Sequence, residues 1–148
     1  MKEKIAVASD HAGYDLKQEL IKFLEIEGYK VDDFGTNDKS SCDYPDFAFK
    51  ASKSVAEKLN DFGILICGTG IGMSIVANKV KGIRAANCCS VDMAKLSREH
   101  NDANILTLGA RLLNLEEAKS IVVAFLNSKF EGDRHLRRIN KINELTGL

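Results

Sequence analysis

Short apolar runs alternate along the chain with segments in which apolar residues recur at helical spacing. The short runs predict five β-strands, at residues 4–9, 29–34, 62–67, 82–88 and 105–108. The segments that separate or follow them predict six helices, at about residues 16–27, 45–59, 72–79, 91–98, 115–127 and 134–145. Strands that alternate with helices in this way are typical of a parallel sheet with helical crossovers.

Helix ends are marked by residues that commonly begin or stop helices. Gly28 follows the first apolar stripe, Pro45 falls in the first turn of the second helix, and Asn114 is placed to cap the fifth. The chain of 148 residues has one proline and no Gly/Ser/Pro-rich linker, so residues 1–148 are expected to form one domain. The predicted fold class is α/β, a single-domain, doubly wound, Rossmann-like sheet of five parallel strands in the flavodoxin-like order 2-1-3-4-5, with a C-terminal helix.

This order predicts where a ligand binds. In doubly wound sheets the crevice lies beyond the carboxyl ends of the strands, where the crossover direction reverses. Here that point falls between the first and third strands. The expected site therefore includes Ser9, Asp10 and His11 after the first strand, and residues 67–70 after the third.

Charge and cysteine content narrow the class of partner. Lys and Arg together number 21, and so do Asp and Glu, so the chain has no net charge that would attract it to nucleic acid or to an anionic membrane. A small partner is therefore expected. The apolar run near the start is too short for a signal peptide or membrane span, so a cytoplasmic protein is expected. Cys42, Cys67, Cys88 and Cys89 lack the CxxC spacing of a zinc site, which favours reduced thiols.

The third strand runs directly into a glycine turn that includes Gly68, Gly70 and Gly72. Backbone amides at such a turn, together with the following helix N-terminus, form a cradle for an anion. The pattern Gly-x-Gly-x-Gly differs from both the dinucleotide fingerprint and the P-loop. The alternative is a turn that needs glycine only for its geometry.

Three titratable side chains are expected at this crevice. Cys67 lies where the strand meets the turn, and a thiol beside a helix N-terminus ionises more readily, so it can act as a base or nucleophile. The alternative for Cys67 is a buried core cysteine. Asp10 and His11 open onto the same crevice, as a proton-transfer site requires, although Asp10 has the alternative role of capping the first helix.

A second set of polar residues lies elsewhere in the sequence. Residues 98–104 form a polar run that predicts an αβ loop, either functional or simply solvated. Because αβ loops lie at the sheet edge opposite the strand carboxyl ends, His100 is expected to act in a neighbouring subunit's site. Arg134 and Arg138 share a helical face and suit a phosphate, with Arg111 joining them, unless they form a solvated basic face.

These motifs, in this order and spacing, resemble the type B ribose-5-phosphate isomerase family over essentially the whole chain. The motifs that carry the resemblance are Asp10-His11, Asp43-Tyr44-Pro45, Ile66-Cys67-Gly68-Thr69-Gly70-Ile71-Gly72, Ala77-Asn78-Lys79, Gly82-Ile83-Arg84, Ser97-Arg98-Glu99-His100-Asn101-Asp102 and Arg134-His135. One departure is Asp133, which stands where a second glycine is common in the family.

The resemblance implies an aldose–ketose isomerase that interconverts ribose 5-phosphate and ribulose 5-phosphate, in the pentose phosphate pathway, through an enediolate. It implies that Cys67 is the base, that His100 assists ring opening, and that Asp10 and Thr69 handle hydroxyl protons. It further implies substrate contacts from Asp10, His11, Gly68, Thr69, Gly70, Ile71, Gly72, Asn101, Arg111, Arg134 and Arg138. No metal or cofactor is expected, and the implied assembly is a homodimer or a dimer of dimers with shared sites.

Two other functions remain open from the sequence. One is an isomerase of a hexose 6-phosphate, of allose or galactose. The resemblance implies that the galactose enzyme is built from two different subunits, which divide the catalytic residues between them. Here Cys67, His100 and the arginines occur in one chain, which disfavours that enzyme. The other is a nucleotide-binding module with Asp92 as the ribose ligand, although the glycine pattern departs from that fingerprint.

Overall fold

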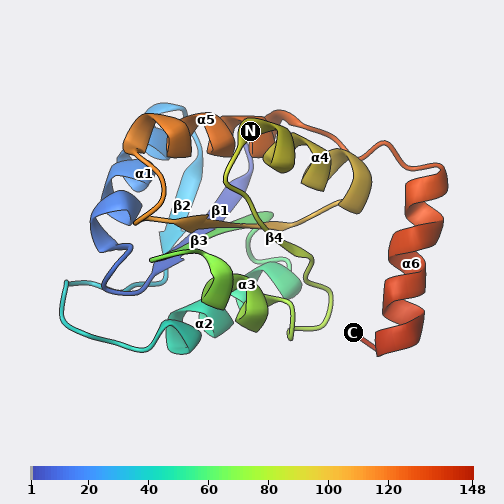
Figure 1. Cartoon of the computed structure of the whole chain (residues 1–148), viewed down its shortest axis with the longest axis horizontal. Coiled ribbons are helices and arrows are strands. Elements are labelled where there is room, and N and C mark those ends of the chain that lie inside the picture. Colours follow the sequence, from blue (N-terminus) through green and yellow to red (C-terminus); the bar gives the residue numbers. More distant parts are fainter. Residues whose placement is uncertain (1) are drawn as a thin grey trace.

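Five parallel strands form the sheet at the centre of the computed structural model, which describes residues 2–148 (Figure 1). The strands are β1 (Lys4–Ser9), β2 (Lys30–Asp33), β3 (Phe62–Cys67), β4 (Ala85–Asn87) and β5 (Ile105–Gly109). The predicted α/β fold class with a parallel sheet is confirmed. β1 and β3 have the predicted bounds, whereas β4 covers only residues 85–87 of the predicted 82–88.

The predicted strand order is wrong at one edge, because the observed order is β2-β1-β3-β5-β4. β5 pairs with β3 on one side and with β4 on the other, so that Ile105 lies between Gly63 and Ala85. Burial explains the exchange: β5 is longer and buried at every position, whereas β4 has three partly buried residues that suit an edge. The reversal between β1 and β3 is unaffected by the change.

Five helices cover the two faces of the sheet (Figure 1). α1 (Tyr14–Ile26), α4 (Val91–Asn101) and α5 (Leu115–Asn127) lie on one face, and α2 (Tyr44–Ala56) and α3 (Ile71–Ala77) on the other. β-Strand alternation divides the core accordingly. Val7, Ile64 and Ile66 pack toward the first layer, and Ala8 and Leu65 toward the second, so that β1 and β3 are buried on both faces.

Helix α4 extends three residues beyond its predicted end, through Asn101. His100 and Asn101 are therefore on a helix and not in the predicted αβ loop. An ion pair of 2.8 Å between Arg98 and Asp102, four residues apart, stabilises the added turn. Asp102 then takes the left-handed conformation, and the amide of Ala103 donates to Ser97 O at 3.0 Å, which closes the helix.

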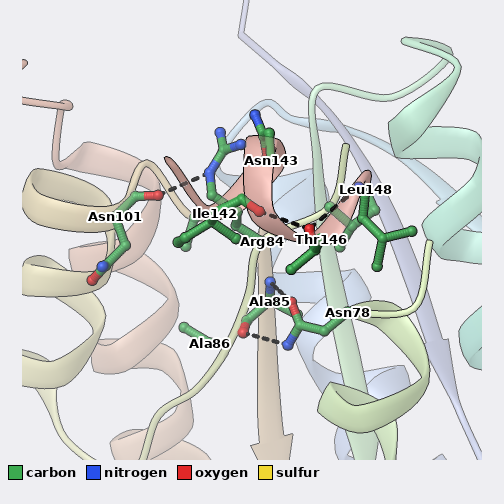
Figure 2. Close-up of a pocket in the computed structure, with 11 residues that line it drawn as sticks. Asn78, Arg84, Ala85, Ala86, Asn101, Ile142, Asn143, Thr146 and Leu148 are labelled. Atoms are coloured by element: carbon green, nitrogen blue, oxygen red, sulfur yellow. Dashed lines mark hydrogen bonds between the residues drawn. The ribbon is translucent and has the colours of Figure 1, made fainter. Parts of the chain in front are cut away.

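The free edge of β4 is partly covered by a side chain. The backbone amide of Ala85 donates to Asn78 Oδ1 at 2.8 Å, and Asn78 Nδ2 donates to the carbonyl of Ala85 at 3.0 Å (Figure 2). These two bonds satisfy backbone groups that an edge strand would otherwise leave unpaired.

The C-terminal helix α6 (Arg134–Thr146) stands apart from both layers (Figure 1) and meets the body of the protein mainly at α4. It buries His135 and Ile139 but leaves Leu136, Ile142 and Leu145 exposed. No helix within residues 2–148 has the length and apolar character needed to cross a membrane.

Asp133, which caps α6, has φ 49° and ψ −126°, a backbone conformation that a side chain disfavours. We expect Asp133→Gly to raise the free energy of unfolding by about 1 kcal/mol, because glycine adopts this conformation without strain. Chemical denaturation measures the effect. Asp133→Asn is the matched control, since it removes the charge and keeps the Cβ; an equal gain in this variant would contradict the conformational explanation.

Candidate active site

The ends of β1 and β3 bring Asp10 and Cys67 side by side. Ser9 pairs with Ile66, and the amide of the next residue, Asp10, donates to Ile66 O at 3.2 Å. Both side chains are nearly enclosed, with Asp10 7% and Cys67 5% exposed. A carboxyl and a thiol therefore share the predicted crevice between the first and third strands.

The backbone of the glycine turn, residues 68–72, contacts the Cys67 sulfur. The amide of Gly70 donates to Cys67 Sγ at 3.1 Å, and an N–H donor of this kind stabilises negative charge on sulfur. Gly70 has φ 80°, and a Cβ there would collide with Asn87 and with the backbone of Leu108. Glycine at this position is required for geometry, and the same geometry places the donor on the thiol.

Arg111 lies over the same turn. The amide of Ala110 donates to Cys67 O at 2.8 Å, and the amide of Arg111 donates to Gly68 O at 3.0 Å. A Cβ on Gly68 would come within 3.0 Å of an Arg111 guanidinium nitrogen, so this glycine lets the cation approach the backbone. The structure thus brings Arg111 to the Cys67 turn.

Thr69, at the tip of the turn, is exposed, and its Oγ1 accepts from the amide of Ile71 at 3.3 Å. Its carbonyl accepts from Asn87 Nδ2 at 3.4 Å, while Asn87 Oδ1 accepts from the Thr107 hydroxyl at 3.0 Å. Asn87 and Thr107 therefore support the turn from β4 and β5. This support was not predictable from the sequence, because it depends on which strands lie next to each other.

Cys42, which lies before α2, and Tyr44, its first residue, contact His11 and the glycine turn. The amide of Cys42 donates to His11 Nδ1 at 3.2 Å, which fixes the imidazole. A Cβ on Gly72 would lie 2.7 Å from the ring of Tyr44, so the aromatic ring packs directly on the turn. Sequence reasoning assigned no role to Tyr44 or Cys42; the motif Asp43-Tyr44-Pro45 was the signal that this segment has one.

Asp10 also bonds to the backbone before α1, although it is not the helix cap that the alternative predicted. Its Oδ1 accepts from the amide of Gly13 at 3.1 Å, at the entrance to α1. The helix cap itself is Gly13. This bond orients the carboxyl group and leaves its second oxygen for a ligand.

The remaining predicted site residues, His100, Asn101, Arg134 and Arg138, do not join this group within the chain. Ile105, which follows His100 and Asn101, pairs with Gly63 at the start of β3, whereas Cys67 pairs with Gly109. At about 3.3 Å per residue, Gly63 and Cys67 lie about 13 Å apart along β3. His100 is therefore at the opposite end of the strands, as expected for a residue in the last turn of a crossover helix.

His100 has two close neighbours of its own. Its ring stacks on that of His135 with centroids 4.3 Å apart and planes at 12°. Glu131 Oε2 lies 4.0 Å from His100 Nε2 and 3.6 Å from His135 Nε2. Burial, followed by the positive charge of Arg134, lowers the pKa of the His135 imidazole. From the sequence, His135 was named only within the motif Arg134-His135, and Glu131 was not singled out.

Comparison with known proteins identifies the family. The model of the ribose/galactose isomerase family matches residues 5–142, and the chain belongs to that family. Ribose-5-phosphate isomerase B of Escherichia coli (strain K12) is 46% identical over 143 residues, covering 97% of this chain and 96% of the relative. The resemblance inferred from the motifs is thereby confirmed.

Solved structures agree with the fold. Ribose-5-phosphate isomerase B of Clostridium thermocellum superposes with a TM-score of 0.96 at 53% identity and covers 97% of each chain. The enzyme of Mycoplasma genitalium, solved with bound ribulose-5-phosphate, has a TM-score of 0.94 at 44% identity and covers 97% of this chain and 96% of its own.

Proposed function

We propose that this chain is an aldose–ketose isomerase that interconverts ribose 5-phosphate and ribulose 5-phosphate. The observation that carries the proposal is the buried thiol of Cys67, with an amide donor on its sulfur, beside Asp10 at the crevice between β1 and β3. The names of the relatives, and the ribulose-5-phosphate bound in the Mycoplasma genitalium structure, support this substrate class.

In the proposed reaction Cys67 is the base. Its thiolate takes the proton from C2 of the open-chain aldose, the C1 carbonyl becomes the enediolate oxygen, and the same proton is returned to C1 as the C2 carbonyl forms. Asp10 and Thr69 exchange the hydroxyl protons at O2 and O1. Backbone amides of residues 68–72 stabilise the developing oxyanion, and removing one such donor typically lowers the rate by about 10²–10³-fold.

We further propose that two copies of the chain share each site, in a homodimer or a dimer of dimers. His100, Asn101, Arg134 and Arg138 lie at the edge opposite Cys67, so one chain supplies two half-sites that face different ways. His11 and Arg111 from one copy, with Arg134 and Arg138 from the other, would bind the phosphate bidentately. His100 of the other copy would donate the proton that opens the furanose ring.

The surface around α6 suits such an assembly. A groove of about 410 Å³ lies between α6 and the β4 edge, with Ile142 and Thr146 on one side and Asn78, Arg84 and Ala85 on the other (Figure 2). Exposed apolar residues of α6 continue this surface. Apolar surface beside charged residues is typical of a protein–protein interface.

Conversion of ribose 5-phosphate by the purified protein tests the function. We expect ribulose 5-phosphate to form, and its rate to be unchanged by a chelator, because no step of the proposed reaction uses a metal. Conversion of allose 6-phosphate or galactose 6-phosphate in place of ribose 5-phosphate would favour the hexose alternative.

A nucleotide-binding role has less support. Asp92 follows β4, and β5 separates β4 from β3, so Asp92 does not end a strand next to the glycine turn. Thermal stabilisation by a nicotinamide or adenine nucleotide, without stabilisation by ribose 5-phosphate, would favour that role.

A further inference from the structure

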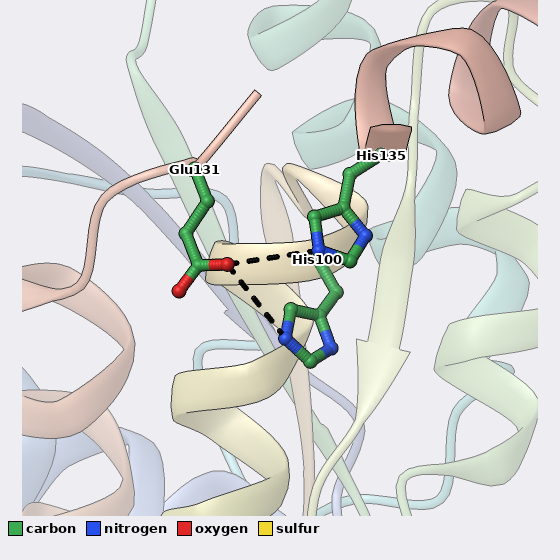
Figure 3. Close-up of side chains that lie close together, drawn as sticks. All are labelled: His100, Glu131 and His135. Atoms are coloured by element: carbon green, nitrogen blue, oxygen red, sulfur yellow. Dashed lines mark ion pairs between the residues drawn. The ribbon is translucent and has the colours of Figure 1, made fainter. Parts of the chain in front are cut away.

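Three potential metal ligands meet where α4, the segment before α6 and α6 itself come together. They are His100, Glu131 and His135, and Figure 3 shows both imidazole rings presenting a nitrogen to the same carboxylate oxygen. The three ligand atoms lie within 4.8 Å of one another. Two imidazoles and a carboxylate, with space for a water, form the donor set of three-ligand zinc sites.

The separations are close to those that a metal ion requires. Bonds of 2.0–2.1 Å at tetrahedral angles place zinc ligand atoms about 3.3 Å apart. Here Glu131 Oε2 lies 3.6 Å from His135 Nε2 and 4.0 Å from His100 Nε2, and the two rings are stacked with their planes at 12°. Because a metal ion bonds to imidazole in the plane of the ring, the His100 ring must turn out of the stack to face an ion held by Glu131 and His135. His100 has the freedom to make this adjustment, because its side chain is 39% exposed.

A second observation points to a ligand at the same place. Within residues 2–148 the Nε2 atom of His135 is buried and has no hydrogen-bond partner, although buried polar atoms are nearly always paired. The His135 side chain is 7% exposed, so solvent has little access to it. A cation bound by Glu131 in the plane of the His135 ring would coordinate this nitrogen.

The backbone holds Glu131 and His135 near α4 in the absence of any ion. The amide of Glu131 donates to Glu99 O at 3.0 Å, which ties the segment before α6 to the last turn of α4. The amide of His135 donates to Gly132 O at 3.0 Å at the start of α6. Two of the three ligands are therefore preorganised, and His100 completes the set by a side-chain movement.

We propose that His100, Glu131 and His135 form a binding site for a divalent transition-metal ion of the zinc type, and that its occupation inhibits the isomerase. The inhibitory part rests on the proposed function, in which His100 opens the sugar ring. Coordination removes the lone pair and the proton that this role requires. Imidazole nitrogen binds zinc-type ions well and binds Mg²⁺ and Ca²⁺ poorly, so these hard cations leave the enzyme active.

Metal binding is measured first, without reference to activity. Equilibrium dialysis with Zn²⁺ and the visible spectrum of the Co²⁺ form are expected to show one ion per chain in a tetrahedral nitrogen and oxygen environment. Glu131→Gln and His135→Asn are each expected to weaken binding about tenfold or more. Cys42→Ser is the matched control, because it removes the thiol 3.8 Å from His11 Nδ1, another pair suited to zinc.

Unchanged affinity in Glu131→Gln and His135→Asn, with both variants folded by circular dichroism, would overturn the site. Loss of binding in Cys42→Ser would overturn it as well. Saturating Zn²⁺ is expected to lower kcat/KM for ribose 5-phosphate about tenfold or more, reversibly with a chelator, and to need about tenfold more metal in Glu131→Gln. Stoichiometric binding without this inhibition would overturn the inhibitory part.

Failure of the proposed function is distinguishable from failure of the site. A protein that binds one ion per chain through these residues but does not convert ribose 5-phosphate disproves the isomerase and retains the metal site. A protein that converts ribose 5-phosphate but binds no ion at these residues retains the isomerase and disproves the metal site.

Discussion

Replacing Cys67 with alanine is expected to lower kcat for ribose 5-phosphate by about 10²–10⁴-fold, the range that a positioned general base contributes. The reason is local. Ile71 and Met73, in the turn and helix that follow, carry no acid or base, and Asp10 has one oxygen bonded to the amide of Gly13. We therefore expect neither the helix that follows nor Asp10, which the proposed reaction uses for hydroxyl protons, to replace the thiolate at the sugar carbons.

The fall is expected in kcat more than in KM, because the phosphate contacts proposed for His11 and Arg111 remain. Steady-state kinetics with ribose 5-phosphate measures both. Cys88→Ala is a matched control, since it removes another buried cysteine with a similar loss of packing. Burial raises the pKa of Cys88 to about 11, so its thiol is protonated at neutral pH and full activity is expected. A Cys67→Ala protein with near-normal kcat would show that the thiol is structural.

The sheet was predictable where the chain's own pattern determines it. β1 and β3 are short apolar runs buried on both faces, and each ends at a turn with glycine, so their bounds follow from the sequence. The order of β4 and β5 was not predictable in this way. It depends on which strand buries more surface against β3, and hydrophobic pattern along a single strand does not contain that comparison.

The extension of α4 illustrates a different limit. Residues 98–104 are polar almost throughout, and a polar run without periodicity favours a loop. The helix continues because the Arg98 guanidinium reaches both Asp102 Oδ1 and the carbonyl of Ala103, while its planar group lies over the ring of Phe62. Those contacts join three elements, so the helix end is fixed by tertiary packing.

The residues of the candidate site were also predictable only in part. Asp10, Cys67 and the glycine turn were predictable, because the topology rule places the ends of β1 and β3 together. Tyr44, Asn87 and Glu131 were not. Each acts on a partner distant in sequence, such as Gly72 for the ring of Tyr44, and no local spacing encodes such a contact.

A mixture of two inactive variants is expected to recover activity if each site takes residues from two subunits. Cys67→Ala removes the proposed base and His100→Asn removes the proposed ring-opening acid, so each homodimer would have two defective sites. In a heterodimer one site combines the intact Cys67 of one subunit with the intact His100 of the other. Random pairing gives half heterodimers with one working site each, so about a quarter of the parent activity returns.

To exchange subunits, equal amounts of the two variants are mixed, denatured and refolded together at low protein concentration. Each variant refolded alone is the control. The recovered rate should scale with the heterodimer fraction, measured by native mass spectrometry. A double variant carrying both changes in one chain, mixed with the parent protein, distinguishes the arrangements further. With shared sites each heterodimer site lacks one residue and is inactive, whereas with sites inside one chain the parent subunit keeps its full rate and the two single variants never complement each other.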